Sequence, residues 1–177
     1  PPPPPVPVAN DECDSVIVLI ENAACSFTAA SVFGATETLP ADSCNNFLST
    51  GAMDVWFSFI CTNSITTIEV DPMFDAVLQL RDACGGGNIL GCSDNVGATD
   101  DEYVTMGGLT VGNTYYIRVH SYGNLPPIDP NFNICVYEGD FVSRDEVEEA
   151  AFRFYPNPTN GMLHIDYNAS VRGTVNV

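Results

Sequence analysis

The chain has 177 residues, with 23 acidic side chains against five arginines and no lysine, which gives a net charge of −18. This balance argues against nucleic acid as a partner, because phosphates require a basic surface, and an anionic membrane surface would repel the chain. A hydrophobic fraction of 45% supplies enough apolar side chains for a packed core, which argues against disorder over most of the length.

Residues 1–8 are rich in proline and are interpreted as a polyproline II spacer. From residue 9 to residue 138 the pattern is one of short strands and frequent turns, which predicts a single all-β sandwich of the Greek-key or jelly-roll type. No amphipathic helix is expected in it. The expected strands are residues 16–20, 53–61, 65–70, 76–80, 103–106, 115–119 and 132–136.

One turn has a specific physical interpretation. Leu109, Gly112 and Tyr115 follow the spacing of a tyrosine corner, a feature of Greek-key sandwiches. Gly112 permits a positive φ, Leu109 caps the core, and the Tyr115 hydroxyl is placed to bond the backbone of the turn.

Seven cysteines lie in the first 135 residues, without a Cys-x-x-Cys pair and with only two histidines, far apart. This spacing argues against zinc and predicts disulfides formed in an oxidising compartment, with one cysteine left over. The ends of the domain predict Cys13–Cys135, and a short glycine loop predicts Cys84–Cys92. The remaining pair is Cys25–Cys44, and Cys61, which ends a core-facing alternation, is expected to be a free buried thiol.

A series of motifs runs in order through this domain: NDEC at residues 10–13, DVWFSF at 54–59, FDAVLQL at 74–80, the Cys84 to Cys92 loop, LTVGNTYYIRV at 109–119 and FNICV at 132–136. Over about 125 residues this series resembles the pre-peptidase C-terminal type of β-sandwich. The resemblance implies an accessory module linked with substrate or surface binding and with secretion, and not with catalysis.

Acidic residues crowd into the loops of the domain, and Ca²⁺ takes six to eight oxygen ligands from such loops. The predicted ligands are Asp75, Asp94 and Asp100, with Asp11 as a further candidate. No EF-hand spacing is present, so solvated loops remain the alternative to a bound calcium ion. No other cofactor is expected.

Catalysis finds little support in the sequence. There is no Gly-x-Ser-x-Gly turn, and His120 and His164 belong to different predicted domains. His120 is expected to be solvated on the outward face of a strand. Trp56, the only tryptophan, either stacks on a sugar from an exposed position or packs between the sheets or beneath a loop.

Residues 139–151 are polar and acidic and are interpreted as a linker, and a second β domain begins at residue 152. In it, two prolines and an Asn-Gly turn precede an alternating strand. The run resembles the start of the C-terminal sorting domain of type IX secretion cargo, a small Ig-like sandwich read by an outer-membrane translocon. The resemblance implies a sorting signal formed by Phe154, Tyr155, Pro156, Asn157, Pro158, Gly161, Leu163 and Ile165.

We therefore interpret the chain, which opens on Pro1 without a signal peptide, as the C-terminal part of a secreted bacterial surface protein. Its expected partners are the translocon and another surface protein or a polysaccharide. Two alternatives remain: a substrate-positioning module of a secreted hydrolase such as a protease, or a unit of an extracellular adhesive fibre.

Overall fold

The computed structural model describes residues 8–40, 42–44, 47–48, 53–95, 99–123, 125–139, 152–155 and 164–167. The chain divides into two compact units, residues 1–139 and 140–177, which are treated separately. Within the described residues the only helix is a 3-10 turn, Cys13–Ser15, and no helix is long and apolar enough to cross a membrane.

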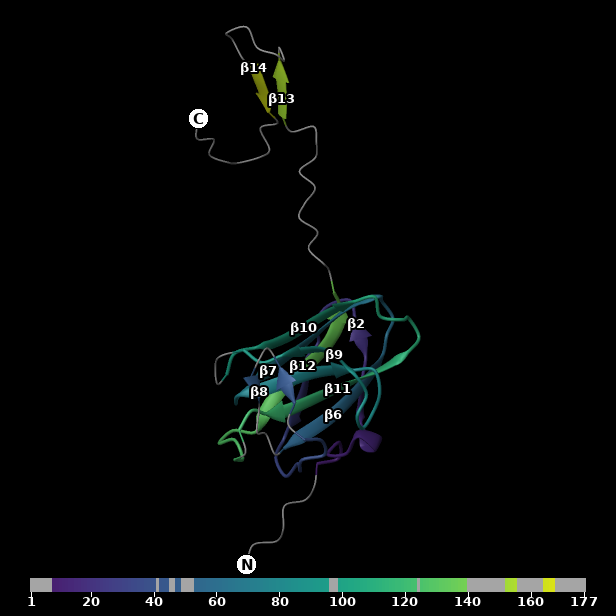
Figure 1. Ribbon diagram of the computed structural model, residues 1–177, viewed down its shortest axis with the longest axis vertical. Helices are drawn as coiled ribbons and strands as arrows, with labels where there is room; N and C mark the ends of the chain where they lie inside the picture. Colours follow the sequence, from purple (N-terminus) through teal and green to yellow (C-terminus); the bar gives the residue numbers. More distant parts are fainter. Residues whose placement is uncertain are drawn as a thin grey trace, which may run out of the picture. The chain divides into compact units, whose positions relative to one another are not determined.

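The first unit is a β-sandwich of two five-stranded sheets, as the strand pattern predicted (Figure 1). The first sheet has the order β1-β6-β11-β8-β9. Its strands are β1 (Ile17–Leu19), β6 (Asp54–Ile60), β11 (Thr114–Ser121), β8 (Ala76–Arg81) and β9 (Ile89–Ser93).

The second sheet has the order β10-β7-β12-β2, with β3 also paired to β12. Its strands are β10 (Glu102–Gly107), β7 (Ile65–Pro72), β12 (Asn131–Glu138), β2 (Glu21–Asn22) and β3 (Thr28–Ser31). A separate two-stranded ribbon joins β4 (Ser43–Cys44) and β5 (Phe47–Leu48).

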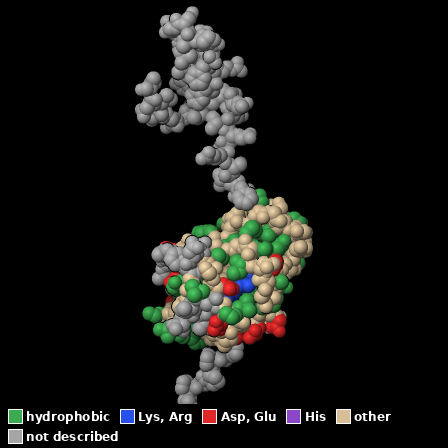
Figure 2. Space-filling model, viewed as in Figure 1, with side chains coloured by type: hydrophobic (Ala, Val, Ile, Leu, Met, Phe, Trp, Pro, Cys, Tyr) green, Lys and Arg blue, Asp and Glu red, His purple; other side chains and the backbone are tan. Residues whose placement is uncertain are grey.

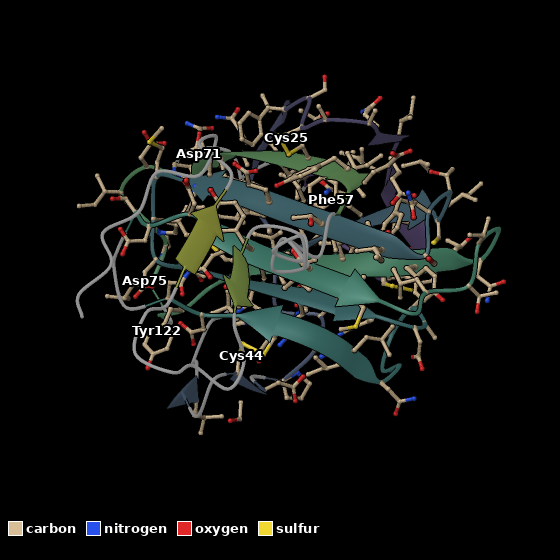
Figure 3. All side chains as sticks on the ribbon, turned by 90° about the horizontal axis from the view of Figure 1, so that it is seen from above. Cys25, Cys44, Phe57, Asp71, Asp75 and Tyr122 are labelled. Carbon is tan, nitrogen blue, oxygen red and sulfur yellow. A yellow bond between two sulfur atoms is a disulfide. The ribbon has the colours of Figure 1, made fainter. Side chains whose placement is uncertain are left out.

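The apolar members of each alternating strand fill the space between the sheets. Phe57, labelled in Figure 3, meets Phe132 of the opposite sheet edge to face, with 6.1 Å between ring centroids. Both rings are buried, as are the inward residues of β8 and β11. This burial accounts for most of the favourable free energy that such a sandwich gains on folding.

The tyrosine corner is confirmed. Gly112 has a φ of +88°, and the backbone N–H of Thr110 donates to the Tyr115 hydroxyl at 2.9 Å. Leu109 is buried in the core beside the turn. The corner therefore fixes the entry of β11, the strand that carries Arg118 and His120.

Three disulfides staple the sandwich, but all three predicted pairings are wrong. The structure joins Cys13 to Cys84, Cys25 to Cys135 and Cys44 to Cys92, and Cys61 is free and buried as expected. The register of β8 with β9 gives the reason. It sets Cys92 opposite Gln79 within β8, whereas Cys84 lies in the turn after β8. Closeness in sequence therefore does not bring the sulfurs of Cys84 and Cys92 together.

In the second unit, β13 (Phe152–Tyr155) pairs antiparallel with β14 (His164–Tyr167). Phe154, Tyr155 and Ile165 of the predicted sorting signal belong to these strands, and Phe154 is paired with Ile165. Pro156, Asn157, Pro158, Gly161 and Leu163 lie outside the described residues.

Candidate functional site

Three features of the sandwich have side chains or a shape suited to binding or chemistry. They are a buried polar layer on the outer face of the first sheet, an apolar groove formed by loops, and a cluster of carboxylates. The strands of the two sheets and the loops between them place the residues of each feature.

The polar layer, called here the arginine face, consists of side chains on β6, β8 and β11 that point away from the core. Register places Arg118 directly between Trp56 and Gln79, and the three form a row across the sheet. The Arg118 guanidinium carbon lies 6.0 Å from the centroid of the Trp56 ring, within reach of a cation–π contact. The other members are Asp54, Arg81 and His120.

Every member of the arginine face is buried. The His120 side chain, which was predicted to be solvated, is 0% exposed, so that prediction is wrong. Trp56 is also 0% exposed and takes the position beneath a loop, one of the alternatives that the sequence left open. The alternation of polar and apolar residues in β11 resembles a strand with one solvated face, and sequence alone gives no sign of a covering segment.

Residues 38–40 and 42–44, called here the strap, cover this face. The Trp56 indole N–H donates to the Thr38 hydroxyl at 2.7 Å, and that hydroxyl donates to Asp54 at 2.7 Å. Cys44 anchors the strap through its disulfide to Cys92 of β9. The strap therefore supplies the hydrogen-bond partners that water would supply to an exposed strand.

Both arginines of the sandwich are paired on this face. The Arg118 guanidinium binds the Asp54 carboxylate at 2.6 Å and also donates to the carbonyl oxygens of Leu39 and Pro40. Arg81 pairs with Asp42 of the strap and donates to the Gln79 side-chain oxygen at 2.9 Å. Figure 2 shows one small spot of basic side chain next to acidic side chains.

The electrostatics of the face keep its histidine neutral. Burial lowers the pKa of His120 to about 3, and the charge of Arg118 lowers it as well. His120 Nδ1 lies 3.1 Å from the carbonyl oxygen of Ser121, so Nδ1 carries the proton and Nε2 is left as an acceptor. Burial also lowers the pKa of Arg118, an effect that Asp54 opposes.

Two polar atoms on the face have no partner among the described residues, His120 Nε2 and Gln79 Nε2. The Gln79 oxygen accepts from Arg81, which fixes its amide with the nitrogen as a donor. The charged groups of the face are paired, Arg118 with Asp54 and Arg81 with Asp42 of the strap. We interpret the arginine face as a structural network that attaches the strap to the sheet.

The groove lies where the segment after β3 meets the loop before β12. It has a volume of about 410 Å³. Phe33 is 65% exposed on this groove and Ile128 is fully exposed, and no strand pattern in the sequence pointed to either of them. The remaining lining residues are Gly34, Ala35, Thr36, Met53, Pro126, Pro127 and Pro130.

The predicted calcium ligands are only partly brought together. Asp75 and Asp94 interact electrostatically, whereas Asp100 is exposed. The Asp11 carboxylate instead accepts hydrogen bonds from the backbone N–H and the hydroxyl of Thr36. Glu102, which was not among the predicted ligands, joins Asp75 and Asp94 and is 1% exposed.

Elsewhere in the described residues, one group of three potential metal ligands gathers within 4.8 Å, namely Cys25, Glu69 and Cys135. Its two sulfurs are joined in a disulfide and are therefore not thiolate ligands. Glu69 accepts hydrogen bonds from the hydroxyls of Tyr103 and Tyr137. This group is interpreted as structural.

Comparison with known proteins supports a binding module. Residues 9–134 match a family that is associated with the type IX secretion system and described as galactose binding domain-like. No match was found among curated proteins or among solved structures. The resemblances to the pre-peptidase module and to the sorting domain stay predictions. The chain belongs to the galactose binding domain-like family associated with type IX secretion, which implies a secreted or cell-surface protein.

Proposed function

We propose that the sandwich is a non-catalytic module of a secreted surface protein and that it binds polysaccharide in the groove beside Phe33. The main support is the exposed aromatic ring of Phe33 on a groove of about 410 Å³, in a domain of the galactose binding domain-like family. An exposed ring offers a flat apolar surface on which a sugar can stack.

The rim of the groove adds groups that can orient a sugar. Thr36 lies on the groove, and its hydroxyl is held at 3.0 Å by the Asp11 carboxylate. The prolines of the lining stiffen the loop, so that less conformational entropy is lost on binding. The module thus acts in adhesion at the cell surface.

The proposal is tested by affinity electrophoresis of the full chain in gels that contain bacterial surface polysaccharides. Phe33→Ala should abolish retardation by the polysaccharide that retards the unmodified chain. Phe27→Ala is the matched control, because Phe27 is also exposed and lies before β3, whereas Phe33 follows it. Retardation of the Phe33 variant equal to that of the control would place binding elsewhere.

We further propose that the second unit carries the sorting signal through Phe154, Tyr155, Pro156, Asn157, Pro158, Gly161, Leu163 and Ile165. The antiparallel pairing of Phe152–Tyr155 with His164–Tyr167 supports this proposal, because paired strands offer a receptor an ordered backbone. Removing residues 152–177 should trap the chain in the periplasm, while exchanging the sandwich for an unrelated domain should leave export intact. Normal export of the truncated chain would refute the assignment.

A further inference from the structure

Three carboxylates gather at one end of the sandwich. Asp75 immediately precedes β8, Asp94 immediately follows β9, and Glu102 opens β10. Leu78 of β8 lies opposite Ser93 of β9, so the antiparallel register brings Asp94 back beside the start of β8. Figure 3 shows Asp75 at this end together with Tyr122, whose backbone N–H donates to the Asp75 carbonyl at 2.8 Å.

These three carboxylates form the acidic cluster, and their charges oppose one another. Burial raises the pKa of all three groups. The charge of Asp75 raises the pKa of Asp94 further, and both charges act on Glu102. The two arginines of the sandwich are paired with Asp42 and Asp54 on the arginine face, so no described arginine neutralises the acidic cluster.

One oxygen in the acidic cluster has no hydrogen-bond partner in the part of the chain that the structure describes. Asp94 is 6% exposed, and its Oδ2 atom is enclosed without a hydrogen-bond donor among the described residues. A buried carboxylate oxygen without a donor or a cation carries a large desolvation cost. Glu102 differs, because its carboxylate accepts from the backbone N–H of Asn95 at 3.0 and 3.2 Å.

We propose that the acidic cluster is a Ca²⁺ site in which Asp75 and the unpartnered Asp94 carboxylate bind the ion directly. The three carboxylates do not place one oxygen each within 4.8 Å of one another, the spacing that three direct ligands of one ion require. Glu102 is already held by Asn95 and therefore acts through a water molecule. Backbone carbonyls and water complete the coordination.

The donor set selects the class of metal. All three side chains offer hard oxygen atoms, and the cluster contains neither nitrogen nor thiolate, which argues against zinc and copper. Loop and strand-end ligands with unequal spacing suit the flexible coordination of Ca²⁺ better than the octahedron that Mg²⁺ requires. Extracellular calcium modules bind with dissociation constants of about 0.1–1 mM, and a similar range is expected here.

The site is tested by thermal unfolding of the full chain in about 5 mM CaCl₂ and in EDTA. This calcium concentration lies above the expected dissociation constant. The unmodified chain should gain several degrees in Tm with calcium. Asp94→Asn should raise Tm in EDTA, because it removes a buried repulsive charge, and should lose the response to calcium. Asp75→Asn should also lose the response. Bound Tb³⁺ should show luminescence excited through tyrosine, and this signal should be absent in the Asp94 variant.

Two matched controls carry exposed acids. Asp100→Asn removes an exposed carboxylate two residues before Glu102 in the sequence, and Asp14→Asn removes one in the 3-10 turn. Both variants should keep the full calcium response. An unmodified chain whose Tm is the same in calcium and in EDTA overturns the proposal, and so does an Asp94 variant that responds as the unmodified chain does.

Discussion

The arginine face and the acidic cluster are both buried and polar, yet they differ in how the desolvation cost of their charged groups is offset. On the arginine face, Arg118 and Asp54 neutralise each other and the strap satisfies most of the remaining donors. In the acidic cluster, three like charges converge and Asp94 Oδ2 has no hydrogen-bond partner among the residues that the structure describes. A matched network is complete within the chain, whereas an unmatched one indicates a missing ligand or a bound proton.

Breaking the pair on the arginine face should give the largest effect. Arg118→Leu leaves the Asp54 carboxylate buried without its cation, which should lower the free energy of unfolding by about 3–5 kcal/mol. Urea denaturation measures this loss. The double variant Arg118→Leu/Asp54→Leu removes both charges and should recover a large part of it. A double variant as unstable as the single one would show that shape, and not charge matching, holds the strap.

The histidine of the arginine face should make the domain sensitive to acid. The pKa of His120 is about 3 in the fold against an ordinary value of 6.5. The contribution of the neutral histidine to the free energy of unfolding is therefore full above pH 6.5 and is lost as the pH falls toward 3. At pH 5 the loss amounts to about 2 kcal/mol, from 1.4 kcal/mol per pH unit. His120→Gln should remove this dependence. Urea unfolding between pH 7 and pH 4 checks it, and parallel curves for both chains would contradict it.

A neutral hydrogen bond sets the scale against which both charged clusters are judged. Tyr115→Phe removes the acceptor for the Thr110 N–H in the tyrosine corner and should lower the free energy of unfolding by about 1 kcal/mol. The same urea experiment measures it. A loss as large as that of Arg118→Leu would remove the distinction between neutral and charged networks.

The acidic cluster should show a pH dependence opposite to that of His120, because burial raises the pKa of its groups and lowers the pKa of the histidine. Burial raises the pKa of Asp94 above its ordinary 3.8, so its contribution is full below pH 3.8 and is lost as the pH rises through the raised value. Asp94→Asn should flatten this part of the profile in EDTA. A profile unchanged by the substitution would show that Asp94 is not the group that titrates.

Local pattern was sufficient for the class of fold. Alternation in residues such as Val55, Phe57 and Phe59 requires a two-layered core whichever strands meet, and the glycine and tyrosine of the corner act within seven residues of one another. These features follow from side-chain period and backbone geometry. The short strands β2, β3 and β9 were missed, because each is too short or too polar to show a period.

Partners distant in sequence were decided only by the tertiary structure. The sequence selected six cysteines for disulfides, but only the fold sets Cys92 beside Gln79 and brings Cys44 of the strap to it. The burial of His120 depends on a strap more than 70 residues away in the sequence. Glu102 reaches Asp94 only because the end of β9 lies beside the start of β10. A strand pattern states which side chains share a face, but only packing determines what lies against that face.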